Sequence, residues 1–210
     1  MPYLGTQPNN VKQNTGLYTP SEILELTKDG SWGGSLELIQ EQTFSGAVSS
    51  IQFTDIKESV YDVHLMVLSN VQCDTDGAST KFYYFEDGVG YETSTVYDWV
   101  RQIQTTAGGS TEQRTVGLAG LTLFGTTDND TNEKNNGYVY FYNLGNASKY
   151  SFNNFQTAGI NFYETGMNFG GGVLKQASKV TGIKFDVSSG NFSSFTIKLY
   201  GVKQIWVILD

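Results

Sequence analysis

Hydrophobic and polar residues alternate along much of this chain, with the period of two that is typical of β-strands. In the segment IKFDV, Ile183, Phe185 and Val187 fall on one face of an extended chain, and the charged residues fall on the other. The same period recurs over residues 194–200 and, with both faces partly apolar, over residues 61–69. These segments predict strands that bury one face in a core.

Clusters of Gly, Asn, Asp and Ser separate the alternating segments, as in DTDGAS, TAGGST and TTDNDTNEKNNG. Short strands divided by such turns favour two packed antiparallel sheets. We therefore expect an all-β fold, an antiparallel, jelly-roll-like β-sandwich. The expected strands lie near residues 36–42, 49–54, 61–69, 80–86, 94–104, 115–125, 137–142, 150–158, 180–187, 192–200 and 203–209.

The start of the chain has a different character. Its first eighteen residues combine Gly, Pro, Asn, Gln and Thr with isolated apolar side chains, too few to form a core. The next segment, TPSEILELTKDG, predicts a short helix over about residues 20–28, with Thr19 as N-cap, Pro20 at the first helical position and Glu22 completing a capping box. We therefore divide the chain into a docking arm, residues 1–34, and a β-sandwich domain, residues 35–210.

A helix this short is marginal in water unless it packs against something. We therefore expect the arm to gain order on another subunit or another protein; the alternative is that it folds back along its own sandwich. The side chains expected to dock are the apolar ones of the arm: Tyr3, Leu4, Val11, Leu17, Tyr18, Ile23, Leu24 and Leu26.

Charge and cysteine content exclude several classes of function. Lys and Arg total 13 against 21 Asp and Glu, a net charge of −8, so the chain lacks the basic stripe that nucleic-acid binding needs. It shows neither a secretory signal nor an apolar stretch of transmembrane length. We therefore expect that the protein does not insert into a membrane and that it assembles in the host cytoplasm. Cys73 is the only cysteine, which excludes an intrachain disulfide framework and a cysteine-based metal cluster.

Three stretches of the sequence are similar to those of a known group of proteins: the start MPYLGTQP, the helix segment leading into SWGGSLELIQEQTFSG, and the block IQFTDIKESVYDVHLMVLSNVQCDTDGASTKFYYFEDG. They resemble virion structural proteins of tailed bacteriophages, especially the tail-fibre and appendage-like proteins of marine cyanophages. In such proteins an N-terminal segment commonly docks onto the particle, and a β-rich body projects outward, often as a trimer. The resemblance implies location in the virion, other tail or capsid proteins as partners, and a homo-oligomer with a trimer favoured.

Three functions follow as hypotheses. The first is a tail-associated fibre or appendage protein that docks through its N-terminal arm and contacts the host surface, with a surface glycan as a candidate partner. The second is a capsid decoration protein that bridges capsid subunits. The third is an appendage that binds carbohydrate or degrades polysaccharide.

Residues capable of catalysis are sparse. His64 is the only histidine, and it shares a strand face with apolar residues, so we expect it to be structural. Glu86, Asp87, Glu92 and Asp98 form an acidic group near aromatic residues, but nothing in their spacing forces two carboxyls together as a glycosidase requires. We therefore predict that the protein is not an enzyme, has no catalytic residues and needs no cofactor.

One loop resembles a calcium-binding loop. Asp128, Asp130 and Asn132 alternate as oxygen ligands would, but Glu133 stands where the sharp-turn glycine belongs and Val139 where the bidentate acid belongs. The sequence DTDG after residue 73 is typical of a turn. We therefore assign no metal site to either place.

Aromatic residues make up 14% of the chain, and they gather in the segment YVYFYNLGNASKYSFNNF. Strand alternation places Tyr138, Tyr140 and Tyr142 on one face, opposite Val139 and Phe141. Because sugar rings stack on exposed aromatic rings, a solvent-exposed tyrosine face predicts a receptor surface; the alternative is a subunit interface.

Overall fold

The structure is a computed structural model that describes residues 19–28, 35–161 and 164–203. The chain divides into two compact units, residues 1–35 and residues 36–210. The second unit contains the described strands and carries the surfaces considered below.

The described part of the first unit is a helix, α2 (Pro20–Lys28), and its capping box is present as predicted. The backbone N–H and the hydroxyl of Thr19 both donate to the Glu22 carboxylate at 2.7 Å, and the Glu22 N–H donates to the Thr19 hydroxyl at 3.3 Å. Of the predicted docking residues, Leu24 is exposed; the others have side chains outside the described residues. No helix in the described ranges is long and apolar enough to cross a bilayer.

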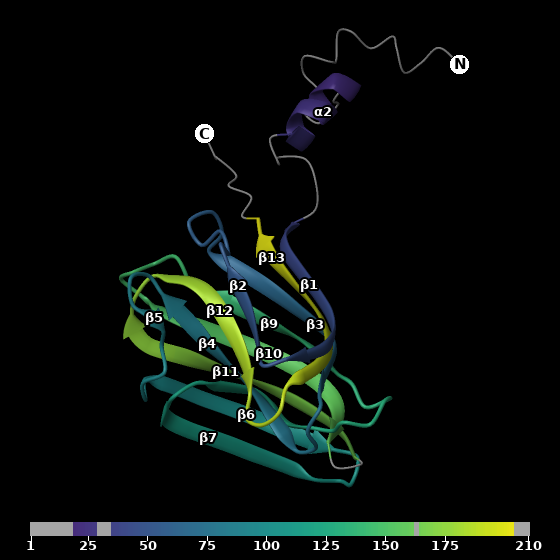
Figure 1. Cartoon of the computed structure of the whole chain (residues 1–210). Helices are drawn as coiled ribbons and strands as arrows, with labels where there is room; N and C mark the ends of the chain where they lie inside the picture. Colours follow the sequence, from purple (N-terminus) through teal and green to yellow (C-terminus); the bar gives the residue numbers. More distant parts are fainter. Residues whose placement is uncertain (1–18, 29–34, 162–163, 204–210) are drawn as a thin grey trace, which may run out of the picture. The chain divides into compact units, whose positions relative to one another are not determined.

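The second unit is an antiparallel β-sandwich, which confirms the predicted fold class. Figure 1 shows β2, β12 and β4 in one layer, with β6 and β7 at the lower edge of the other. The eight-stranded sheet runs β1 (Leu36–Val48), β13 (Phe192–Val202), β3 (Val63–Cys73), β9 (Asn135–Tyr142), β10 (Tyr150–Asn161), β11 (Glu164–Ala177), β6 (Tyr97–Thr105), β7 (Ser110–Leu118). The five-stranded sheet runs β2 (Ser50–Thr54), β12 (Val180–Val187), β4 (Ala78–Glu86), β5 (Gly90–Tyr91), with β8 (Leu121–Thr127) also paired to β4.

The chain crosses repeatedly between the two sheets, as in a jelly roll. β1 and β3 belong to the large sheet and β2 and β4 to the small one; later, β12 lies in the small sheet between β11 and β13 of the large one. As a result, β13 pairs with both β1 and β3. Figure 1 shows β1 and β13 side by side.

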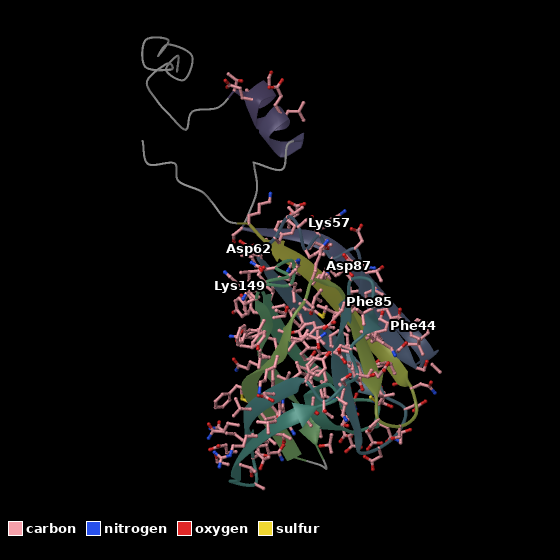
Figure 2. All side chains as sticks on the ribbon, turned by 90° about the vertical axis from the view of Figure 1, so that its left-hand side faces the viewer. Phe44, Lys57, Asp62, Phe85, Asp87 and Lys149 are labelled. Atoms are coloured by element: carbon pink, nitrogen blue, oxygen red, sulfur yellow. The ribbon has the colours of Figure 1, made fainter. Side chains whose placement is uncertain are left out.

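Aromatic side chains dominate the core between the sheets. The Phe82 ring of β4 lies 5.8 Å from the ring of Tyr84, 5.6 Å from that of Phe141 and 5.9 Å from that of Phe185, between centroids. All four side chains are buried, and most of the contacts are edge-to-face or tilted, the favoured arrangement of aromatic rings. Figure 2 shows side chains filling the space between the sheets, with Phe44 at the right and Lys149 at the left of the view.

Most predicted strands are confirmed with ends that shift by a few residues, but three predictions are wrong or incomplete. β11 was not predicted, because Gly170, Gly171 and Gly172 interrupt its apolar alternation. The predicted strand 115–125 is in fact the end of β7 and the start of β8, divided at Gly120, whose φ of 151° favours glycine. The predicted strand 203–209 is not seen at Lys203, and its remainder lies outside the described residues.

Candidate binding surface

The outer face of the eight-stranded sheet is the face turned away from the five-stranded sheet. On β9 the predicted alternation is confirmed: Val139 and Phe141 are fully buried in the core, while the three tyrosines lie on the outer face. Tyr138 is 39% exposed, and Tyr140 and Tyr142 are half-buried. The tyrosine face is therefore in contact with solvent in the single chain.

Strand register continues this face into rows that cross four strands. In one row Tyr138 of β9 pairs with Gln156 of β10, which pairs with Phe169 of β11, which pairs with Gln102 of β6. In a sheet, directly opposed residues on one face have Cβ atoms about 5 Å apart. An aromatic ring is therefore followed by an amide and again by an aromatic ring.

The next row begins in the same way, with a tyrosine and an amide, and then differs on β11 and on β6. Tyr140 pairs with Asn154, Asn154 with Gly171 of β11, and Gly171 with Val100 of β6. Gly171 has no side chain, so the row is interrupted by a depression at β11. A third row places Tyr142 opposite Phe152, and Phe152 opposite Val173.

Contacts between neighbouring side chains fix the tyrosine rings. The Tyr138 hydroxyl donates to Gln156 Oε1 at 3.0 Å, and the Tyr142 hydroxyl donates to Asn154 Oδ1 at 2.9 Å. The Tyr140 ring lies 5.8 Å from the Tyr138 ring, edge-on, and 6.4 Å from the Tyr142 ring, stacked. The three rings therefore form a continuous aromatic strip that is held in place before any ligand binds.

A groove of about 610 Å³ lies beside this strip, where the sheet has its glycine depression. Phe152 stands on the β10 side of the depression, and Val100 and Val116 stand on the β6 and β7 side; all three are exposed. The groove is lined by Asp98, Trp99, Val100, Arg114, Thr115, Val116, Phe152, Asn153, Gly171, Gly172 and Val173.

Charged groups at the groove are largely compensated. Asp98 accepts a hydrogen bond from the Gly117 N–H at 3.0 Å and pairs with Lys175 at 3.1 Å, and these contacts lower the pKa of its carboxyl. Arg114 lies 3.8 Å from Glu112, and both side chains are well exposed. The groove therefore combines apolar walls with little net charge.

The tyrosines of this surface follow from the alternation along the sequence, but the other half of the surface does not. Phe152 could have been found by the same alternation, since Phe155, three residues on, faces the core. Phe169 and the depression at Gly171 could not, because they depend on β11. Exposed apolar side chains also include Met167 on the same strand.

The acidic residues considered for catalysis each have local structural partners. Glu86 is buried and accepts hydrogen bonds from Gln176 Nε2 at 2.7 Å and from the Ser178 hydroxyl at 2.9 Å. Glu92 is buried and accepts from the Ser94 N–H at 2.6 Å. Asp87 is exposed and lies 4.0 Å from Lys179, and Asp98 lies on the outer face, in the groove. The four carboxyls are therefore divided between the core and the surface.

The histidine lies in the core. His64 is fully buried, its Nε2 lies 2.8 Å from the Ile56 carbonyl oxygen, and burial lowers the pKa of its imidazole. Its ring also contacts Tyr61 edge-on. Cys73 is fully buried, and burial raises the pKa of its thiol, so it packs as a small apolar side chain.

The two turns considered for calcium come together. The Gly77 N–H donates to the Thr127 carbonyl at 2.9 Å, and Asp76 lies against Asp128, which raises the pKa of the Asp76 carboxyl. The pKa of Glu133 is also raised, by burial and by the charges of Asp128 and Asp130. Even so, in the part of the chain that the structure describes, no three His, Cys, Asp or Glu side chains are arranged to hold a metal ion.

Comparisons with known proteins add little to this geometry. Neither the protein-family models nor the curated proteins give a match. Among solved structures, the chain is similar to "Alginate lyase from Alteromonas sp.272", with a TM-score of 0.24 and 9% sequence identity over 80% of this chain and 97% of that one. A likeness of this size supports no conclusion about fold or activity.

Proposed function

We propose that the protein is a non-enzymatic component of a tailed-bacteriophage particle, a tail-associated fibre or appendage protein that binds host surface polysaccharide. Its arm, residues 1–34, docks on other virion proteins, and its body carries the polysaccharide-binding surface on the outer face of the eight-stranded sheet. The body acts in a homo-oligomer, with a trimer favoured.

The observation that carries the polysaccharide proposal is the interleaving of rings and amides on this face. A pyranose ring has an apolar face that stacks on an aromatic ring and a rim of hydroxyls that bond to amides. Tyr138 and Phe169 stand on either side of Gln156, and Tyr140 stands beside Asn154. Both needs of a sugar are thus met within one row of the sheet.

The composition of the face favours a glycan over a second subunit. Permanent subunit interfaces are rich in apolar side chains, like a core divided in two. Here Gln102, Gln104, Asn154 and Gln156 separate the exposed apolar residues, and a groove interrupts the surface. A hollowed face on which amides alternate with exposed rings suits a narrow chain of sugars better than a flat protein partner.

Calorimetric titration of the full chain with purified envelope polysaccharides measures binding and tests the proposal. We expect Tyr140→Ala to weaken binding at least about fivefold, because loss of one stacking ring removes on the order of 1 kcal/mol. Tyr91→Ala is the matched control, since Tyr91 lies in the five-stranded sheet, where its ring contacts Phe85 and Lys184. No reducing sugar should be released during the titration.

Two results would overturn the proposal. If Tyr140→Ala and Tyr91→Ala weaken binding equally, the outer face is not the binding surface. If the polysaccharide is depolymerised by the purified chain, the protein is an enzyme.

A further inference from the structure

Arg101 is a buried cation for which the described residues supply no counter-charge. It lies on the inner face of β6, where the whole residue is 6% exposed. Its Nε and Nη2 donate to Gln113 Oε1 at 3.1 and 2.8 Å, and its guanidinium lies 4.7 Å from the centre of the Trp99 ring. Neither contact is with an anion, and no ion pair of Arg101 occurs among the residues that the structure describes.

This charge persists at physiological pH. Burial lowers the pKa of Arg101 to about 10, and no neighbouring acid offsets that effect. The guanidinium therefore stays protonated at neutral pH. Burying a charge without a partner destabilises the folded state, and a bound anion would reduce this unfavourable free energy.

A polar cavity of about 230 Å³ adjoins the guanidinium, here named the Arg101 cavity. Two donors on its wall, Arg101 Nη1 and Asn135 Nδ2, are buried and have no hydrogen-bond partner. Asn135 is only 4% exposed. Buried donors are nearly always satisfied in folded proteins, so two orphans on one cavity wall indicate a missing acceptor.

Glycines on the neighbouring strands make room for the two donor side chains at the cavity wall. A Cβ atom on Gly125 would lie 2.6 Å from Arg101 Nη2 and 2.9 Å from Nη1. A Cβ on Gly159 would lie 1.9 Å from the Asn135 side-chain oxygen. Gln113, on the β7 side of the cavity, is exposed, so solvent reaches this wall.

We propose that the Arg101 cavity binds a small monocarboxylate, whose oxygens accept hydrogen bonds from Arg101 Nη1 and Asn135 Nδ2. Arg101 Nε and Nη2 already donate to Gln113, so Nη1 is left for one carboxylate oxygen and Asn135 Nδ2 for the other. A hydrogen bond between a guanidinium and a carboxylate is charge-assisted and therefore strong. The cavity wall holds one formal positive charge and no acidic residue, so a monoanion is neutralised there and a dianion is not. The site lies between the sheets and is separate from the outer-face surface proposed for polysaccharide.

Nuclear magnetic resonance of arginine side chains tests the proposal with acetate as the probe. The full chain has only two arginines, Arg101 in the cavity and Arg114 on exposed β7, so only two Nε–H signals are expected. Replacing either arginine by methionine removes one signal and thereby assigns both. With sodium acetate, at a constant sodium concentration set with sodium chloride, the Arg101 signal should shift and saturate. The Arg114 signal should show only the small, non-saturating effect of salt.

Stability measurements give an independent readout. Saturating acetate should raise the unfolding temperature of the wild-type chain by about 3 °C or more, since a ligand that binds only the native state stabilises it. Arg101→Met should abolish this rise, and Arg114→Met, the matched control, should retain it. Sulfate, a dianion, should bind at least about tenfold more weakly than acetate, because its second charge remains uncompensated.

A second variant keeps the test valid if Arg101→Met fails to fold. Asn135→Asp places a carboxylate of similar shape in the cavity, so it should raise the unfolding temperature without acetate and abolish the response to acetate. The proposal is overturned if wild type and Asn135→Asp respond to acetate equally, if the Arg101 signal does not saturate, or if sulfate binds more tightly than acetate.

Discussion

Asp74 and Asp76 stand two residues apart in the turn between β3 and β4, and their carboxyls have opposite surroundings. Asp74 accepts hydrogen bonds from the Asn191 N–H at 2.8 Å, from Asn191 Nδ2 at 3.0 Å and from the Thr75 hydroxyl at 2.9 Å, and these bonds lower its pKa. Asp76 faces Asp128, and that contact raises its pKa. One turn thus holds a stabilising and a destabilising charge.

Amide substitutions at these positions should therefore change stability in opposite directions. At about pH 7 we expect Asp76→Asn to increase the free energy of unfolding, because the amide can donate to Asp128, and Asp74→Asn to decrease it. A raised pKa means that ionised Asp76 costs stability only as the pH rises above its ordinary value of 3.8, so the gain should vanish at about pH 3.

The effect of Asp74→Asn should fade at low pH for the converse reason. A lowered pKa means that Asp74 stabilises the fold above its ordinary value of 3.8 and loses this effect as the pH falls through its lowered pKa. Urea unfolding of both variants and wild type at the two pH values measures this. A change of the same sign for both variants at about pH 7 would contradict the assignment.

The imidazole of His64 gives a second dependence on pH. Because burial lowers its pKa below the ordinary value of 6.5, the unfolded chain binds a proton more readily than the folded one in this range. We expect stability to fall as the pH drops below about 6.5 and His64→Leu to reduce that slope, as measured by urea unfolding across this interval. A slope that is unchanged in the variant would show that other groups dominate.

At the level of single residues, the outer position of the tyrosines and the core position of the histidine were predictable, and the Arg101 cavity was not. Tyr138, Tyr140 and Tyr142 follow a local period of two, which the sequence displays directly. Arg101 and Asn135 lie far apart in sequence and share a cavity only because β6, β9 and β8 come together. No local pattern carries that information.

Among the elements, β11 shows how close packing of backbones selects glycine. A Cβ on Gly170 would lie 2.3 Å from the Val100 carbonyl oxygen and 2.7 Å from the Arg101 Cα, both fixed atoms of the neighbouring strand. A Cβ on Gly171 would lie 2.6 Å from the Asn153 carbonyl oxygen. The same glycines that allow this approach make the segment look like a loop in the sequence.

Substitution in this strand should be costly. We expect Gly170→Ala to lower the free energy of unfolding by about 1–3 kcal/mol, because the backbone of β6 must shift to admit a methyl group. The control is Gly109→Ala in the turn after β6, where the nearest atom to the added Cβ is the Thr105 hydroxyl at 3.4 Å. Chemical denaturation measures both; equal losses would contradict the packing argument.

The helix α2 was the easiest element to predict, because its start depends on neighbouring residues. Thr19, Pro20 and Glu22 specify its first turn through local hydrogen bonds, and the structure has those bonds. The division between β7 and β8 was harder, since the apolar run continues through Leu118 and Leu121, and the glycines there do not by themselves show where one strand ends and the next begins.

On the scale of the whole molecule, the two units differ in how far each can hold its own structure. The sandwich has a continuous aromatic core, whereas the described part of residues 1–35 is one nine-residue helix with Leu24 54% exposed. A chain lacking residues 1–35 should therefore unfold within about 2 °C of the full chain. It should also fail to incorporate into particles if the arm is the anchor.

Incorporation can be separated from folding with a point variant. Leu24→Asp should reduce the number of copies per particle while the unfolding temperature of the sandwich is unchanged. Glu25→Gln, at the adjacent exposed position of α2, is the control. Normal occupancy of the truncated chain would show that the arm is not the attachment point.

The pairing of β1 with β13 affects how the chain can fold while it is being synthesised. Leu36 pairs with Val202, so a strand that leaves the ribosome early must wait for one of the last to be translated. Until then β3 also lacks the neighbour that separates it from β1. Nascent chains that stop short of residue 192 would expose two long unpaired strand edges, so we infer that premature termination yields aggregation rather than a smaller folded product.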